Sequence, residues 1–179
     1  MKEEDDRTLV RRCRDGDRAA FEQLVLRYQK AVFNAAVRLL RDPEDARDVA
    51  QTTFLKAFEH LADYDPSFKF YSWIYRIAVN QALNTLASRR PVGEMSGEEA
   101  DEAPGPDQRV EGEQMGREIE EALMEIKPEL RTVIVLRHFM HLSYHDMADV
   151  LELPEKTVKS RLYSARQLLR DHLLQHGAL

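Results

Sequence analysis

The chain of 179 residues is 43% hydrophobic and 32% charged with a net charge of -6, which suits one medium or two small packed domains. Its apolar stretches are too short to cross a membrane and its acidic start is unlike a secretory signal, so we expect a cytoplasmic protein. Cys13 is the single cysteine, which excludes an intramolecular disulfide and a multi-cysteine zinc site, and we assign it no role.

Helical periodicity predicts the elements of the first part of the chain. A short helix comes first, and apolar residues at three- and four-residue steps from Phe21 to Leu39 then predict a long core helix. Asp42 and Pro43 suit the cap and the first position of a second helix that reaches about His60. A third long helix follows a polar break and ends near Arg90.

Two kinds of side chain mark the third helix and the segment before it. Arg76, Asn80 and Asn84 are four residues apart and form one polar stripe. Aromatic residues and a lysine crowd just upstream of that stripe: Phe68, Lys69, Phe70, Tyr71, Trp73 and Tyr75. Such a mixture suits unstacked bases, since base stacking on an aromatic ring contributes about 1 to 3 kcal/mol. The same aromatics could instead form a hydrophobic core, and for Trp73 the two alternatives are about equally favoured.

The segment 91–115 has a composition unlike the rest of the chain. It contains eight acids, one base, several glycines and prolines, and almost no large apolar residue. Such a segment cannot bury enough surface to offset the entropy lost on ordering. We therefore expect a flexible acidic linker at 91–115, between a first domain at 1–90 and a second at 116–179. Because this linker carries most of the net negative charge, a DNA-binding surface elsewhere remains possible.

The last third of the chain has the pattern of a helix-turn-helix. Helices are expected at 119–126 and 128–139, and Ser143 with Asp146 resembles a capping arrangement that opens a short helix to Leu151. A tight break at 152–154 precedes a final helix, whose apolar side is formed by Val158, Leu162, Ala165 and Leu169. Two helices joined by so short a turn are typical of domains that place a recognition helix in the major groove.

The outward side of that final helix is basic. Lys156, Lys159, Ser160, Tyr163 and Gln167 lie opposite its apolar side, and Arg161, Arg166 and Arg170 flank them. These side chains suit phosphates and base edges. A solvated amphipathic helix is the alternative, which the turn and the capping pattern disfavour.

Three stretches together resemble a known family. They are DARDVAQ at 45–51, WIYRIAVN at 73–80, and the helix-turn-helix from LSY at 142–144 to TVKSRL at 157–162. In this order, and separated by a linker, they look like the hallmarks of extracytoplasmic-function sigma factors of the sigma-70 family. The resemblance covers nearly the whole chain outside the linker. It implies an all-α protein of two small helical domains that directs RNA polymerase to promoters without being an enzyme.

The resemblance also implies a role for particular residues. In the family, one helix docks on the clamp coiled coil of the largest polymerase subunit, which here corresponds to Asp45, Asp48, Gln51 and Leu55. The melted −10 strand would be taken by Phe68, Lys69, Phe70, Trp73, Arg76, Asn80 and Asn84, with a flipped base in the loop at 63–70. The −35 duplex would be contacted by Lys156, Thr157, Lys159, Ser160, Arg161, Tyr163 and Arg166.

The remaining expectations concern partners and alternatives. The family resemblance implies core RNA polymerase, through its clamp and flap, promoter DNA and an anti-sigma factor as partners, and no cofactor. A free-standing helix-turn-helix regulator would explain the second domain equally well but leaves the first unexplained. A metal site at His138, His141 and His145 is a weaker hypothesis, because zinc sites need three or four ligands and no cysteine accompanies these histidines.

Overall fold

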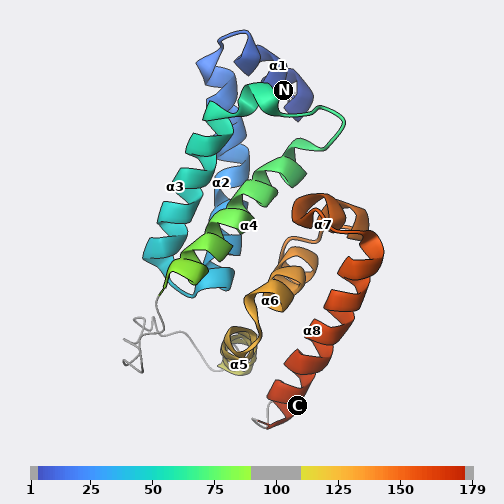
Figure 1. The fold of residues 1–179 in the computed structure, drawn as a ribbon. Coiled ribbons are helices and arrows are strands. Elements are labelled where there is room, and N and C mark those ends of the chain that lie inside the picture. The colour runs from blue at the N-terminus through green and yellow to red at the C-terminus, as the bar shows by residue number, and fades with distance from the viewer. Residues whose placement is uncertain (1–3, 90–109, 176–179) are drawn as a thin grey trace.

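The computed structural model describes residues 4–89 and 110–175, so most of the expected linker at 91–115 lies outside the described residues. Every regular element in the described part of the chain is a helix, which confirms the expected all-α class (Figure 1). The first domain contains α1 (Asp6–Arg14), α2 (Arg18–Leu40), α3 (Pro43–Glu59), the 3-10 turn η1 (Leu61–Asp63) and α4 (Phe70–Ser88).

Side-chain caps set where the helices of the first domain begin. The Asp17 carboxylate accepts hydrogen bonds from the first backbone amides of α2, and Asp42 does the same for α3 at 2.9 and 3.1 Å. Pro43 occupies the first position of α3, as the sequence predicts. Behind these caps, Leu24, Leu39 and Ile74 are almost fully buried and join α2 to α4 in one core.

The second domain contains α5 (Val110–Glu125), α6 (Pro128–Ile134), the π-helical turn η2 (Val135–Phe139), α7 (Tyr144–Leu151) and α8 (Glu155–Gln175). Helix α5 starts nine residues before Ile119, where the periodicity placed its start. Gly112 and Gly116 lie inside it, and each costs a helix only about 1 kcal/mol relative to alanine. The observed helix thus begins earlier than the apolar periodicity predicted.

The helix-turn-helix forms as predicted. Ser143 and Asp146 make a capping box at the start of α7, in which the Ser143 hydroxyl accepts from the Asp146 amide at 3.1 Å. Glu152 ends α7 in the left-handed conformation with φ of 53°, and Pro154 then precedes α8. Val158 and Leu162 of α8 are buried and belong to a hydrophobic core that also includes residues of the first domain.

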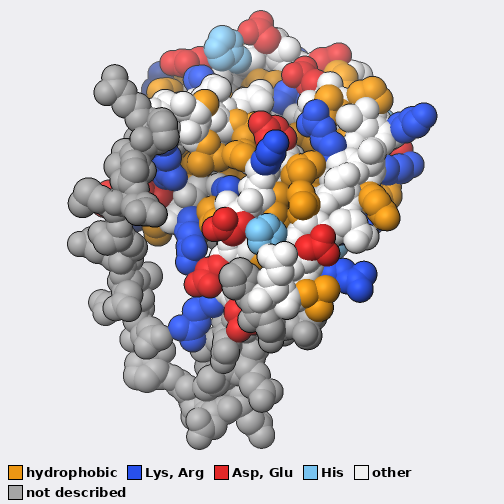
Figure 2. Space-filling model, turned by 60° about the horizontal axis from the view of Figure 1, so that its bottom comes forward, with side chains coloured by type: hydrophobic (Ala, Val, Ile, Leu, Met, Phe, Trp, Pro, Cys, Tyr) orange, Lys and Arg blue, Asp and Glu red, His pale blue; other side chains and the backbone are white. Residues whose placement is uncertain are grey.

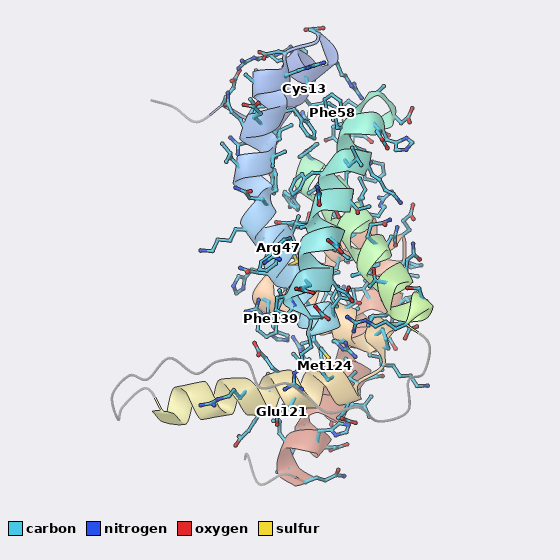
Figure 3. The ribbon with its side chains drawn as sticks, turned by 90° about the vertical axis from the view of Figure 1, so that its left-hand side faces the viewer. Cys13, Arg47, Phe58, Glu121, Met124 and Phe139 are labelled. Carbon is cyan, nitrogen blue, oxygen red and sulfur yellow. The ribbon has the colours of Figure 1, made fainter. Side chains whose placement is uncertain are left out.

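The two domains pack against each other. Helix α7 lies beside α4, and α8 runs along the outer edge of the molecule (Figure 1). Helix α5 crosses beneath the ends of α2 and α3, and Phe139 lies beside the C-terminal end of α2 (Figure 3). The Arg38 guanidinium stacks on the Phe139 ring, 4.3 Å from its centre. Among the described residues, no helix is long and apolar enough to span a membrane.

Candidate nucleic-acid and polymerase-binding surfaces

An open groove of about 380 Å³ lies between the end of α3 and the outer face of α4. It is lined by Lys56, His60, Asp63, Trp73, Ile77, Asn80 and Gln81. Asn80 and Asn84 of the predicted polar stripe are exposed on α4, whereas its third member, Arg76, is half-buried. The groove therefore offers an aromatic ring, amides and a lysine at one accessible place.

The aromatic residues before and within α4 divide between core and surface. Phe70 and Tyr75 are both buried beside Tyr28. Phe70 is 3% exposed and Tyr75 is 8% exposed, so neither ring has a free face for a base. Burial raises the pKa of Tyr75 to about 12. Trp73 is half-buried at the groove and contacts Tyr64, with ring centres 5.2 Å apart, while Phe68 is exposed. Among the predicted aromatics, the geometry thus favours Trp73 and Phe68 over Phe70 for stacking.

The loop after η1 is held by Arg14, which the sequence analysis did not single out. The Arg14 guanidinium donates to the backbone carbonyls of Leu61 and Ala62 at 3.1 Å and also to that of Tyr64. The Tyr64 hydroxyl donates to the Phe68 carbonyl and closes the same loop. An arginine on the first helix gives no signal in the sequence that its partner is a loop about fifty residues away.

A neighbouring edge of α4, which includes Arg76 of the polar stripe, contacts the second domain. Lys69 Nζ lies 2.9 Å from Asp146 Oδ1, and the Arg76 guanidinium donates to the Asp149 carbonyl and to the Glu152 carboxylate at 3.1 Å. Hydrogen bonds to Tyr71 and Asp146 raise the pKa of Lys69. Burial opposes ionisation of Asp146, but hydrogen bonds from Ser143 and Lys69 outweigh it and lower the pKa of that carboxyl.

The predicted −35 residues lie on one outward face of α8, where most are exposed. Tyr163 has an exposed fraction of 68%; Lys156, Lys159, Ser160 and Arg166 are also exposed, and Thr157 and Arg161 are half-buried. Lys159 Nζ sits 5.2 Å from the centre of the Tyr144 ring and 3.4 Å from Glu155. Tyr144 also stacks against Arg137, so this tyrosine of α7 holds the basic face in place.

The predicted polymerase-binding residues lie along α3. Asp48, Gln51 and Leu55 are exposed, Leu55 with 57% of its surface, whereas Asp45 is bonded to Arg89 at the end of α4. Phe58, half exposed one turn beyond Leu55, adds a second exposed apolar side chain to this helix and packs edge-on against Phe21 of α2. The sequence analysis missed Phe58, although its three-residue spacing from Leu55 could have indicated the shared face.

Two of the three histidines of the metal hypothesis, His138 and His145, have other contacts. Arg166 Nε donates to His138 Nε2 at 3.2 Å, and His145 lies near Asp149 and Glu155. Burial, with Arg166 and Arg137 nearby, lowers the pKa of His138. Within residues 4–89 and 110–175, no group of three or more histidine, cysteine or acidic side chains is arranged to hold a metal ion.

Positive charge gathers at particular places on the surface, although the protein as a whole is acidic. On the face drawn in Figure 2, acidic and basic side chains are interspersed around exposed apolar groups, with no single field of one sign. This agrees with a net charge of -6 and with basic residues gathered on one side of α8. Contact with nucleic acid is therefore expected at particular faces and not over the whole molecule.

Comparison with known proteins identifies the family. The model of sigma-70 region 2 matches residues 24–92, and that of sigma-70 region 4 matches residues 116–169. The RNA polymerase sigma-H factor of Pseudomonas aeruginosa is 35% identical over 98% of this chain and 96% of its own. The extracytoplasmic-function sigma-E factor of Haemophilus influenzae is 33% identical over 94% and 95%. The chain belongs to the sigma-70 family and is a sigma factor of the extracytoplasmic-function group, which directs core RNA polymerase to promoters.

Solved structures share the fold across both domains. The structure of CnrH in complex with the cytosolic domain of CnrY matches with a TM-score of 0.73 and 30% identity, covering 94% of this chain and 96% of that one. The sigma factor RpoE of Bartonella quintana, in complex with the anti-sigma factor NepR, matches with a TM-score of 0.66 and 22% identity, covering 86% and 96%. Because the match of both domains to sigma-70 regions explains the first domain too, a free-standing regulator no longer accounts for the chain.

Proposed function

We propose that this sigma factor reads its promoters in two forms, with the first domain (1–90) capturing the melted −10 strand and the second domain (116–179) reading the −35 duplex. The segment 91–115 would link the two. The observation that carries this proposal is the open groove beside α4, which brings Trp73, Asn80 and Lys56 together at one accessible place. An aromatic ring, an amide and a cation are the groups that hold a single-stranded base by stacking, hydrogen bonding and charge.

Capture of the open strand supplies the free energy for opening the duplex. Extruding one base costs a few kcal/mol, and stacking with hydrogen bonding in a preformed groove offsets that cost. The loop held by Arg14 reaches the groove at Asp63 and would receive the flipped base, with the exposed Phe68 beside Arg76 as a further ring for stacking. The protein acts by binding alone and needs neither a cofactor nor a catalytic group.

The second domain would read duplex DNA through α8. Its exposed Lys159, Ser160 and Tyr163 reach base edges in the major groove, while Arg161 and Arg166 fix the register on phosphates. Lys156 and Thr157 sit at the start of the helix, where backbone amides also favour phosphate oxygens.

The α3 surface formed by Asp48, Gln51, Leu55 and Phe58 would dock on the clamp coiled coil of the largest polymerase subunit in the cytoplasm, with the second domain contacting the flap. Exposed apolar side chains beside acids and an amide have the composition of a specific protein interface. The bonded Asp45 would act indirectly, by fixing the end of α4 through Arg89.

An anti-sigma factor is a further proposed partner. Two similar solved structures are complexes, CnrH with the cytosolic domain of CnrY and RpoE with the anti-sigma factor NepR. A protein of this kind would control the factor by covering its polymerase- and DNA-binding faces.

Multi-round transcription on a pooled genomic promoter library, with purified core polymerase, tests whether the −10 element is bound as a single strand and the −35 element as duplex. Asn80→Ala should reduce initiation about fivefold to tenfold and relax the base preference at −10, since it removes one or two hydrogen bonds. Lys159→Ala should instead change the −35 preference. Gln23→Ala, an exposed amide on α2, is the matched control. Start sites that are unchanged by both substitutions would refute the assignment.

A further inference from the structure

Lys159, which is proposed above to reach base edges, has a side chain that can point in many directions. Its ammonium is a single charge at the end of a flexible stem, and 53% of the side chain is exposed. A donor distinguishes one base from another only when it approaches the base edge at a fixed place and angle. A restraint on the ammonium is therefore needed if Lys159 is to select a base rather than merely attract DNA.

Two contacts restrict this ammonium, and they come from different helices. The Glu155 carboxylate, one helical turn earlier on α8, lies 3.4 Å from Lys159 Nζ. An exposed ion pair at this spacing is weak and leaves the lysine free to move around the carboxylate. Tyr144, at the first position of α7, adds a restraint from outside α8, because the centre of its ring lies 5.2 Å from Lys159 Nζ.

The Tyr144 ring is itself held in place. Tyr144 is half-buried, packs against the hydrophobic core and directly follows Ser143, whose capping box fixes the start of α7. The Arg137 guanidinium lies 4.8 Å from the centre of the same ring and donates to the Leu142 carbonyl at 2.7 Å. Core packing and an anchored arginine together restrict the orientation of the ring.

The kind of contact matters for DNA binding. Tyr144 meets both cations with its ring and not with its hydroxyl group. The face of an aromatic ring attracts a cation without cancelling its charge, whereas a second carboxylate at this place would cancel it and weaken the attraction to phosphates. The ring therefore limits where the ammonium lies and leaves its charge available for acceptors such as O6 and N7 of guanine.

We propose that Tyr144 is a positioning residue that sets the base preference of Lys159 at the −35 element. Tyr144 acts through Lys159 and makes no base contact of its own. The inference rests on the proposed reading of the −35 duplex by α8, and it adds the residue that makes one of those contacts selective.

The test uses the full chain assembled with core polymerase and a pool of short duplexes that end before the −10 element. In this pool the −35 region of one promoter, recovered in the transcription experiment above, is randomised. Sequencing of the bound duplexes gives the preference at each base pair, and titration of the whole pool gives the mean affinity. Lys159→Ala first identifies the base pair whose preference depends on Lys159. At that pair Tyr144→Leu should reduce the preference about threefold to fivefold, while the mean affinity changes less than about twofold.

Three further variants separate positioning from a general structural effect. Tyr144→Phe keeps the ring and should retain the wild-type preference. Phe139→Leu removes another half-buried ring that lies beside an arginine, away from α8, and should alter no −35 preference. In a Lys159→Ala background, Tyr144→Leu should have no additional effect at the identified base pair, as expected for two residues that act as a unit.

The outcomes distinguish this inference from the assignment on which it rests. If Lys159→Ala alters the preference at no base pair, the proposed role of Lys159 fails and the inference with it. If Lys159→Ala alters one pair that Tyr144→Leu leaves unchanged, only the positioning role is refuted. An equal loss at every base pair would give Tyr144 a purely structural role, and a Tyr144→Phe variant that behaves like Tyr144→Leu would assign the effect to the hydroxyl group. Either result overturns the proposal.

Discussion

Arg14 shows how one residue can organise a site it does not enter. Its guanidinium gathers the carbonyls of Leu61, Ala62 and Tyr64, so the loop next to the groove keeps one backbone shape. The planar fork of arginine suits several carbonyl acceptors, while the single ammonium of lysine could satisfy fewer of them in one geometry. Arg14 is thus a positioning residue for the proposed −10 surface.

Arg14→Ala is expected to lower the free energy of unfolding by about 1 kcal/mol, the scale of charged hydrogen bonds discounted for solvent exposure. It should also flatten the base preference at the flipped position more than it reduces total initiation. Urea unfolding and transcription on promoters varied at that base measure the two effects. Arg11→Ala, an exposed arginine on the same helix, serves as the control. A preserved base preference in Arg14→Ala would contradict the positioning role.

At the scale of the element, α7 is short and depends on its caps. A helix of eight residues forms few internal hydrogen bonds, so the capping box of Ser143 and Asp146 contributes a large share of its local stability. Asp146 additionally pairs with Lys69, which links the start of α7 to α4.

Ser143→Ala should destabilise the protein by about 1 kcal/mol, the usual effect of losing an N-cap side chain. Urea unfolding followed by circular dichroism would detect the change. Ser164→Ala, on the exposed side of α8, should be neutral or slightly stabilising, because alanine favours a helix interior. Equal effects of the two substitutions would show that the cap contributes nothing.

Local signals explain which elements could be predicted from the sequence. Caps, prolines and apolar periodicity act over a few residues, and they placed α2, α3 and the helix-turn-helix close to their observed bounds. The burial of Phe70 and the contact of Lys69 with Asp146 join residues far apart in the chain. A single sequence carries no local mark of such pairs, so the aromatic set was only partly resolved into core and surface.

For the whole molecule, the arrangement of faces decides what can be bound at once. The α3 surface proposed to bind polymerase is exposed on the far side of the first domain from α7. Docking there would therefore leave the contact between α4 and α7 unobstructed.

Leu55→Asp should weaken binding to core polymerase about tenfold without unfolding the protein, because the side chain is already 57% exposed. Competition against a labelled sigma factor for a limited amount of core measures the loss. Leu26→Asp on α2, where the leucine is 69% exposed, is the matched control and should compete like the wild type. Equal losses in both variants would move the docking surface away from α3.

The single tryptophan of this chain stands in the wall of the groove beside α4. Trp73 touches the rings of Tyr64 and Phe70 and keeps part of its own ring toward the groove. A base stacked on an indole quenches its emission, and no second indole would obscure the change. The molecule therefore carries an intrinsic optical probe, and stopped-flow fluorescence could time the arrival of the strand without any attached dye.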